Sequence, residues 1–463
     1  MHRQSLTRTG RDLVRLPDHR TSGRDQRIRP LANVAILLAI SGLTLQPGLG
    51  LAEQSDTVVI RAGAQLHGGV ATLQTELTLG AVNGPPDQLF SQIGDLEVRS
   101  DGTLIVLENG GPSRMIREFD ASGQFIRELG GIGEGPGEFT YPQAMALAPD
   151  GRLFVLDRGA RTRRMIVYSQ AGDPIAHWWP FPAFRGAAGY DPDGLIRFDP
   201  SGEIISILIN IAAPNAPAFD TFFDEAILRL QPDGTVVDTV KPNLPVPPYL
   251  IEPICTRNPN ARRPPNAPPA QPNCRPMPYS PRFFWAWHPD GFLVTGRSDR
   301  YAIDLRIPSG RLEGNGSYPV WRPTDAVRSI RVSRQVISVS EAERRDRQRL
   351  IEDDIRGLPV VSGGINIPAQ KPVWKQFRVA DDGRIWVSVS TPSREATEGR
   401  AEREWREDTL YEIFELDGRF VGKVAVPLGF EIRVIKGDLL WGFSVDEFDV
   451  PFISRYKVVW PSS

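Results

Sequence analysis

Charged side chains recur at matching positions of six similar segments of the chain. Each segment is a short apolar stretch that ends in a turn with glycine, and the six can be aligned on that glycine. One aligned position carries Glu97, Ala146, Arg197, Ala286, Arg378 and Arg433, and the position two residues earlier carries Asp95, Ala144, Leu195, Phe284, Gln376 and Glu431. Because side chains alternate along a strand, both positions fall on the same side of it. The sixth alignment requires a shortening by one residue.

Arginine in a strand that is otherwise suited to burial needs a physical reason, because an unpaired buried charge is costly. Arg197, Arg378 and Arg433 come from separate segments and could form a basic collar that binds an anionic ligand through bidentate guanidinium contacts. The alternative is an internal ion-pair network, in which Asp95, Glu97 and Glu431 neutralise the arginines around water. The residue types leave both hypotheses open.

The elements that must position these residues are repeated hairpins. DLEVRSDGTLIVLENG (95–110) and AMALAPDGRLFVLDRG (144–159) each join two apolar strands through Asp-Gly, which suits a tight turn because glycine tolerates positive φ. The same unit recurs at 195–208, 284–296, 376–389 and 431–443. The sequence therefore predicts six hairpin units.

Further strands follow each hairpin. A third strand is predicted at 115–123, 165–172, 226–234, 301–310, 410–418 and 454–460, and a fourth segment follows the first five, including RLEGNGSYPV (311–320) in unit four. The sixth unit has no fourth strand before Ser463. LQTELTLG (73–80) precedes the first unit and would complete the sixth by pairing with 454–460, which leaves no long edge exposed.

The stretch GGIGEGPGEFTYPQAMALAPDGRLFVLDRGARTRRMIVYSQAG (130–172) resembles NHL-repeat propellers, within the wider class of TolB-like six-bladed folds. A weaker form of its Gly-Pro-Gly-Glu-Phe linker, GPPDQLF (84–90), precedes the first unit. The resemblance implies an all-β, six-bladed β-propeller in which the first strand of each blade lines a central tunnel. It implies ligand binding at a tunnel mouth but no particular activity, since the fold hosts lyases, lactonases and binding proteins.

No catalytic constellation is recognised. The chain lacks a Gly-x-Ser-x-Gly nucleophile motif, and His67, His177 and His288 occupy different structural positions, so no metal site is predicted. Propellers of the gluconolactonase type hold a calcium-like ion with Glu, Asn and Asp; Asp95, Glu97, Asn210 and Glu431 offer the residue types without the spacing. We therefore predict a non-catalytic module that binds a protein, peptide, saccharide or anion, with no required cofactor. The alternative is a metal-dependent lyase or lactone hydrolase, for which calcium is the candidate ion.

Two insertions depart from the repeat. Residues 241–281 contain fourteen prolines, which disfavour helix and central strand, and Cys255 and Cys274 in this loop predict a disulfide. The second insertion covers about 321–372. Within it, Ser340 and Glu343 have capping-box spacing and Gly357 is a stop signal, so one short charged helix is expected over a propeller face. It is either a lid over the tunnel mouth or a solvated decoration.

Bulk composition and the N-terminus indicate the compartment. With 54 basic and 56 acidic residues and a net charge of −2, the chain lacks the basic footprint of a nucleic-acid-binding protein. The apolar run LANVAILLAISGLTL (31–45) follows a long Arg-rich segment, which predicts a signal peptide over 1–52 and a mature propeller over 53–463. We expect a periplasmic or secreted protein without a stable membrane span; an uncleaved anchor is the alternative.

Overall fold

The structure is a computed structural model, and it describes residues 56–60, 66–110, 113–158, 163–178, 196–199, 201–210, 225–240, 253–257, 273–307, 310–313, 320–323, 326–396 and 404–461. The chain divides into two units, Met1–Ala52 and Glu53–Ser463, and every described element belongs to the second. The predicted signal peptide therefore lies outside the described residues, as does most of the proline-rich insertion.

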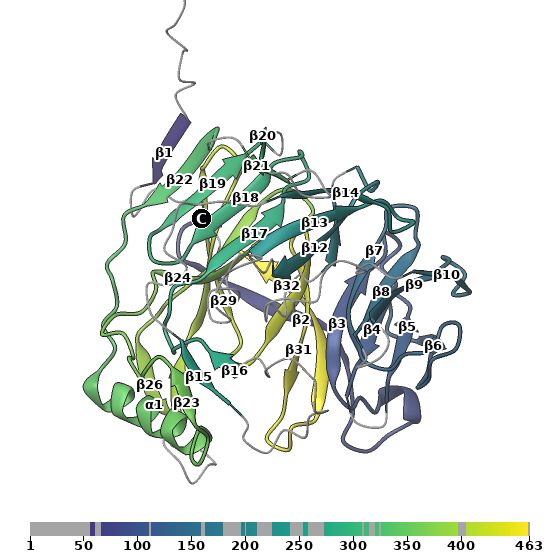
Figure 1. Cartoon of the computed structure of the whole chain (residues 1–463), viewed down its shortest axis with the longest axis horizontal. Coiled ribbons are helices and arrows are strands. Elements are labelled where there is room, and N and C mark those ends of the chain that lie inside the picture. Colours follow the sequence, from purple (N-terminus) through teal and green to yellow (C-terminus); the bar gives the residue numbers. More distant parts are fainter. Residues whose placement is uncertain are drawn as a thin grey trace, which may run out of the picture. The chain divides into compact units, whose positions relative to one another are not determined.

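Antiparallel four-stranded units dominate the described part of the chain, and each begins with one of the six predicted hairpins (Figure 1). We number these units as blades 1 to 6. Blade 1 comprises β3 (Ile93–Val98), β4 (Leu104–Glu108), β5 (Met115–Phe119) and β6 (Phe125–Gly130); blade 2 comprises β7 (Pro142–Leu147), β8 (Leu153–Arg158), β9 (Arg163–Tyr168) and β10 (Pro174–Trp178). Blade 3 comprises β11 (Ile196–Phe198), β12 (Ile205–Asn210), β13 (Glu225–Leu230) and β14 (Val236–Val240).

Blades 4 to 6 follow the same order. Blade 4 comprises β17 (Phe283–Trp287), β18 (Leu293–Arg297), β19 (Ala302–Arg306) and β22 (Arg328–Val332); blade 5 comprises β24 (Trp374–Val379), β25 (Ile385–Val389), β28 (Thr409–Phe414) and β29 (Phe420–Val426). Blade 6 comprises β30 (Glu431–Lys436), β31 (Leu439–Val445), β32 (Pro451–Val459) and the early strand β2 (Val70–Leu79). The architecture is an all-β propeller with one described α-helix.

The hairpin glycines have the backbone conformation that the sequence predicted. Gly102 has a φ of 87° and Gly151 of 85°, a region that L side chains rarely adopt. In each case the glycine N–H donates to the carbonyl three residues earlier, Arg99 or Ala148. The Asp-Gly signal therefore marks true strand–turn–strand units.

β2 is paired with strands from the far end of the chain. It runs antiparallel to β32 from Thr72 opposite Val459 to Leu79 opposite Ile453, and it meets β29 in parallel at Val70 and Ala71. This is the pair that the sequence predicted between 73–80 and 454–460. Ala71 is fully buried in a core cluster with residues of blades 5 and 6.

The fourth strand of blade 4 differs from the prediction. The segment expected there contributes β20 (Gly310–Glu313), which pairs with β21 (Val320–Pro323), and β21 extends blade 3 by pairing with β14. β22 occupies the predicted place instead, antiparallel to β19, and β1 (Asp56–Ile60) adds a parallel fifth strand to β22. Part of the predicted second insertion is therefore a blade strand.

The acidic residue after the second strand of blades 1 and 2 anchors the linker that enters the blade. Glu108 accepts hydrogen bonds from the main-chain N–H and the hydroxyl of Ser91 at 2.9 and 3.1 Å. Asp157 accepts from the main-chain N–H groups of Thr140 and Tyr141, the latter at 2.6 Å. The Gly-rich segment before Phe139 is thus a connection between blades, as its sequence context indicated.

The inserted helix is α1 (Glu341–Asp354), and Ser340 caps it by accepting from the N–H of Glu343 at 3.1 Å. The carboxylate of Glu343 is buried among side chains outside the helix, where it accepts from Ser393 at 2.6 Å and lies 3.7 Å from the ammonium of Lys371. Lys371 stands three residues before β24. The helix is therefore attached near the start of that strand.

A small separate sheet joins the two insertions. It contains β16 (Asn273–Arg275), β15 (Ile254–Thr256) and β23 (Val360–Ser362), and Cys255 lies directly opposite Cys274 across the β15–β16 pair. The hairpin of β26 (Ser393–Ala396) and β27 (Glu404–Glu407) packs beside α1, since the indole of Trp405 donates to Asp346 at 3.0 Å. Figure 1 shows α1, β15, β16, β23 and β26 gathered together.

Candidate functional site

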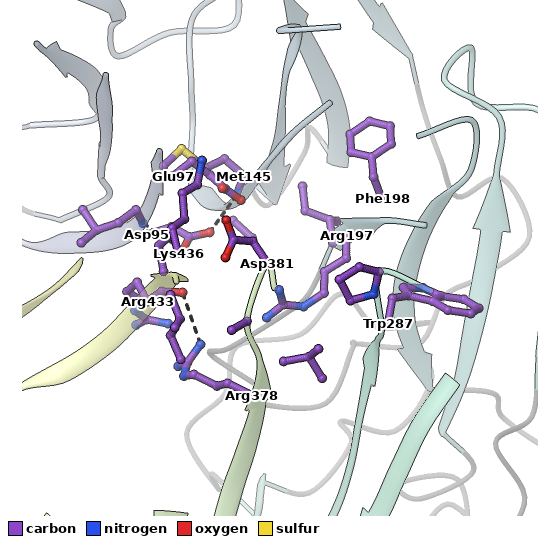
Figure 2. A pocket seen from close by; sticks show the side chains of 18 of the residues that line it. Asp95, Glu97, Met145, Arg197, Phe198, Trp287, Arg378, Asp381, Arg433 and Lys436 are labelled. Carbon is purple, nitrogen blue, oxygen red and sulfur yellow. Dashed lines mark hydrogen bonds between the residues drawn. The ribbon is translucent and has the colours of Figure 1, made fainter. Parts of the chain in front are cut away.

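The first strands of all six blades line one cavity of about 300 Å³ (Figure 2). The residues around it belong to these strands and to the turns that follow three of them: Asp95, Leu96, Glu97, Ala144, Met145, Ile196, Arg197, Phe198, Trp287, His288, Pro289, Arg378, Val379, Ala380, Asp381, Arg433, Val434, Ile435 and Lys436. β3 lies against β7 and β30, and β7 lies against β11. The sequence repeat thus places residues of all six blades around a single cavity.

Cationic side chains from three blades face this cavity. Arg197 comes from β11, Arg378 from β24, and Arg433 and Lys436 from β30. Arg378 is 7% exposed and donates from Nη1 to the carbonyl oxygen of Arg433 at 3.5 Å, and the ammonium of Lys436 donates to the carbonyl of Val98 at 2.8 Å. These contacts hold the charged groups in place at the cavity wall.

Two partly exposed carboxyl groups of β3, those of Asp95 and Glu97, share the cavity with the cations. Burial is the main cause that raises the pKa of Asp95, although Arg433 and Arg197 oppose it. Burial raises the pKa of Glu97 to about 8, the charge of Asp95 adds to this, and Arg197 and Lys436 act against it. Glu97 is therefore mostly protonated at neutral pH, which leaves the cavity positively charged.

Five of the six predicted collar residues line the cavity, and Glu431 does not. The reason is a bulge in β30: Ile432 pairs with Gly442 and Val434 with Trp441, so Arg433 is an extra residue between them. The bulge breaks the alternation that would have placed Glu431 and Arg433 on one side of the strand. Glu431 is instead 40% exposed and pairs with Arg433 at 2.8 Å, which realises one contact of the predicted ion-pair network.

Sequence reasoning missed Lys436 and Asp381, which lie at the turn ends of their strands. Lys436 directly precedes the turn glycine Gly437, and Asp381 accepts a hydrogen bond from the N–H of Gly437 at 2.8 Å. Figure 2 shows Asp381 projecting toward the space between Asp95 and Arg197. The turn positions of the repeat would have been the signal, because turns as well as strands surround the cavity.

The wall formed by β17 and its turn combines an aromatic ring with a fully bonded histidine. The indole nitrogen of Trp287 donates to the hydroxyl of Ser206 at 3.1 Å. The Nδ1 of His288 accepts from the N–H of Asp290 at 3.0 Å, so Nε2 carries the proton that it shares with the carbonyl of Gly383 at 2.9 Å. His288 therefore ties blade 4 to blade 5.

The three histidines that were candidate metal ligands have different structural surroundings. His67 stacks on Trp460 with ring centroids 4.4 Å apart, and His177 is exposed on β10. Among the described residues, no group of three or more His, Cys, Asp or Glu side chains is arranged to hold a metal ion. The side chain of Asn210, named for a calcium-like ion, lies outside the described part.

A sequence model of the family described as "6-bladed beta-propeller" matches residues 84–198, which cover blades 1 and 2 and the start of blade 3. No curated protein matches the chain. The match and the observed sheets together support a six-bladed β-propeller.

Several solved structures are similar over most of their length. They include a Bacteroides fragilis protein named as an exported protein (10% identity, 88% of this chain and 100% of that one, TM-score 0.43). A Bacteroides vulgatus protein of the DUF4221 family is similar at 10% identity over 85% of this chain and 99% of that one, with a TM-score of 0.43. The pyrroloquinoline-quinone-bound aldose sugar dehydrogenase of Streptomyces coelicolor is similar at 14% identity over 84% and 98%, with a TM-score of 0.39.

One observation bears on membranes. In the ranges that the structure describes, no helix combines the length and the apolar character needed to cross a bilayer.

Proposed function

We propose that this protein is an extracytoplasmic binding module that holds a small anionic ligand in the cavity at the centre of the propeller. The observation that carries the proposal is the convergence of Arg197, Arg378, Arg433 and Lys436 on one cavity of about 300 Å³. Guanidinium groups bind carboxylates and other oxyanions through two parallel hydrogen bonds, and a site shielded from bulk water strengthens such contacts. The volume suits a ligand of metabolite size.

The carboxyl group of Glu97 in the cavity is compatible with a bound anion. Glu97, with its pKa raised to about 8, can donate a hydrogen bond to an anion at neutral pH. An ionised ligand beside Glu97 would favour the protonated form further, so binding should take up protons at pH values near 8. We expect affinity for anions to fall as the pH rises above that value.

Calorimetric titration of the mature protein with acetate, succinate, sulfate and inorganic phosphate tests the proposal. At least one anion should bind at a single site, and Arg378→Met or Arg433→Met should weaken it about 10- to 100-fold. Arg419→Met is the matched control, because Arg419 is a surface arginine paired with Glu415 outside the cavity. Binding that is equal in all variants, or absent for every anion, would reject the proposal.

Metal analysis of the purified protein distinguishes the proposed binding role from the alternative, a metal-dependent lyase or lactone hydrolase. A stoichiometric calcium or zinc ion that is lost in the Asp95→Asn variant would favour that activity over a plain binding role. Lactone hydrolysis measured before and after chelation would then be the direct assay.

Three finer features belong to the same proposal. The ring is an NHL-type propeller that β2 closes between β29 and β32, Cys255 and Cys274 form a disulfide, and residues 1–52 are removed on export. The opposed positions of the two cysteines support the disulfide. Intact mass of the exported protein, with and without a reductant and a thiol-alkylating agent, tests the cleavage and the disulfide together.

A further inference from the structure

The charged side chains around the central cavity fall into two sets. One set also lines a second cavity of about 60 Å³, and it consists of Arg197, Arg378 and Arg433. The other set lines the larger cavity alone, and it includes the carboxyl groups of Asp95, Glu97 and Asp381. In Figure 2 these carboxyl groups lie above the guanidinium groups. A ligand in the larger cavity therefore meets arginines on one side and carboxyl groups on the other.

Two of the three carboxyl groups already face cations of the protein. The charges of Arg433 and Arg197 act on Asp95, and those of Arg197 and Lys436 act on Glu97. Glu97 is in addition mostly protonated at neutral pH, because its pKa is raised to about 8. Neither of these groups needs a cation from a ligand.

Asp381 differs from them, because it forms no ion pair within the described ranges. Its neighbours in the turns, Asp382 and Asp438, both pair with Arg384, at 2.6 and 2.9 Å. The Asp381 carboxylate instead accepts from the N–H of Gly437 at 2.8 Å, which uses one of the roughly four acceptor positions of a carboxylate. Asp381 can therefore accept hydrogen bonds from a cationic group of a ligand.

We infer that the bound anion is an acidic amino acid, whose carboxylates contact the arginines and whose ammonium group contacts Asp381. This inference rests on the anion binding proposed above. An anion that carries one ammonium group must carry at least two anionic groups, and arginines from three different blades can contact both of them. A cavity of about 300 Å³ suits a molecule of this size.

Calorimetric titration of the mature protein with succinate, L-malate and L-aspartate at neutral pH is the test. These dicarboxylates differ only in carrying a hydrogen, a hydroxyl or an ammonium group at one carbon. Aspartate should bind about five- to tenfold more tightly than succinate, because its ammonium group makes a charge-assisted hydrogen bond that water around the exposed Asp381 partly screens. Malate should bind with an affinity between the two, since its hydroxyl brings no charge.

Two variants locate the ammonium group. Asp381→Asn should weaken aspartate about fivefold and tighten succinate about twofold, because it removes a negative charge from the cavity wall. A misfolded protein cannot produce changes of opposite sign. Asp382→Asn is the matched control, because it makes the same change one residue further along and outside the cavity lining, and it should keep the wild-type ratio of the two affinities.

Three results would overturn the inference while leaving anion binding intact. They are aspartate binding no tighter than succinate, malate binding equal to aspartate, and a preference for aspartate that survives in Asp381→Asn. Failure of every carboxylate and inorganic anion to bind would instead remove the proposed function.

Discussion

Asp95 of blade 1 accepts a hydrogen bond from the main-chain N–H of Met145 in blade 2 at 3.1 Å. The same carboxylate accepts from the N–H of Leu96 at 3.0 Å. A side chain at the cavity wall therefore joins the first strands of two neighbouring blades. Its charge also raises the pKa of Glu97, so one residue links the stability of the ring with the electrostatics of the site.

Asp95→Ala should lower the free energy of unfolding by about 1–3 kcal/mol, because it leaves the buried N–H of Met145 without its acceptor. Asp95→Asn keeps an oxygen acceptor and should stay close to wild type in stability. Urea unfolding followed by tryptophan fluorescence measures both. Equal losses in the two variants would contradict the role of the hydrogen bond.

Glu97 should make the protein less stable as the pH rises. Its pKa is about 8 in the folded protein and 4.5 is its ordinary value, so between these values the unfolded chain releases a proton that the folded chain retains. The contribution of Glu97 to stability therefore falls between pH 4.5 and 8 and is constant above that range. Thermal unfolding as a function of pH should show this slope, and Glu97→Gln should remove it.

Asp101 provides the matched control for that measurement. It lies just after the same strand, but hydrogen bonds from Thr103 lower its pKa below the ordinary value of 3.8. Its stabilising effect is present above that value and lost only as the pH falls below it, so Asp101→Asn should leave the slope between pH 4.5 and 8 intact. A slope that survives in Glu97→Gln would show that another group titrates.

Lys371 should be indispensable for the attachment of α1. Its side chain is inaccessible to solvent and lies 3.0 Å from Glu407 and 3.7 Å from Glu343, while its ammonium donates to the carbonyl of Thr391 at 3.0 Å. Lys371→Met leaves the buried carboxylate of Glu343 without its cation and should destabilise by about 3–5 kcal/mol.

Lys375→Met is the control, because Lys375 contacts the same Glu407 at 3.5 Å from a position that is 34% exposed. A loss below about 1 kcal/mol is expected there. Urea unfolding and limited proteolysis within 333–372 would measure both variants. Similar small losses in the two would mean that α1 is held by other contacts.

The repeat could be predicted because its signals are local. An Asp-Gly turn between two apolar runs defines a hairpin within about fifteen residues, and the Ser340 cap defines the start of α1 in the same way. The fourth strand of blade 4 has no such signal. The segments 310–313 and 328–332 are both short. The first joins blade 3, because it pairs with β21 and β21 pairs with β14, whereas the second pairs with β19 of blade 4. Contacts between residues distant in sequence decide both pairings.

The site was predictable where strand alternation holds. Asp95 and Glu97 follow the irregularity between Ile93 and Asp95, so both remain on the cavity side of β3. In β30 the irregularity falls between Ile432 and Val434, four residues before the turn glycine, and it separates Glu431 from Arg433. A bulge has no distinct sequence signature in this strand, so the position of Glu431 could not be inferred from spacing alone.

Ala71 offers a direct test of how the early strand β2 is held between blades 5 and 6. Its side chain is fully buried between blades 5 and 6, opposite Val424 of β29, whereas the next residue, Thr72, is exposed. Ala71→Asp would place a charge in that core and should lower the free energy of unfolding by roughly 3 kcal/mol or more, while Thr72→Asp should change it by less than about 0.5 kcal/mol. Because β2 also pairs along its length with β32, a weakened junction should expose the edges of both strands to protease before the remaining blades unfold. Limited proteolysis with mass spectrometry would identify the first cuts. Cleavage that begins in blades 2 or 3 in the Ala71→Asp variant would show that β2 is not the element on which the stability of the junction depends.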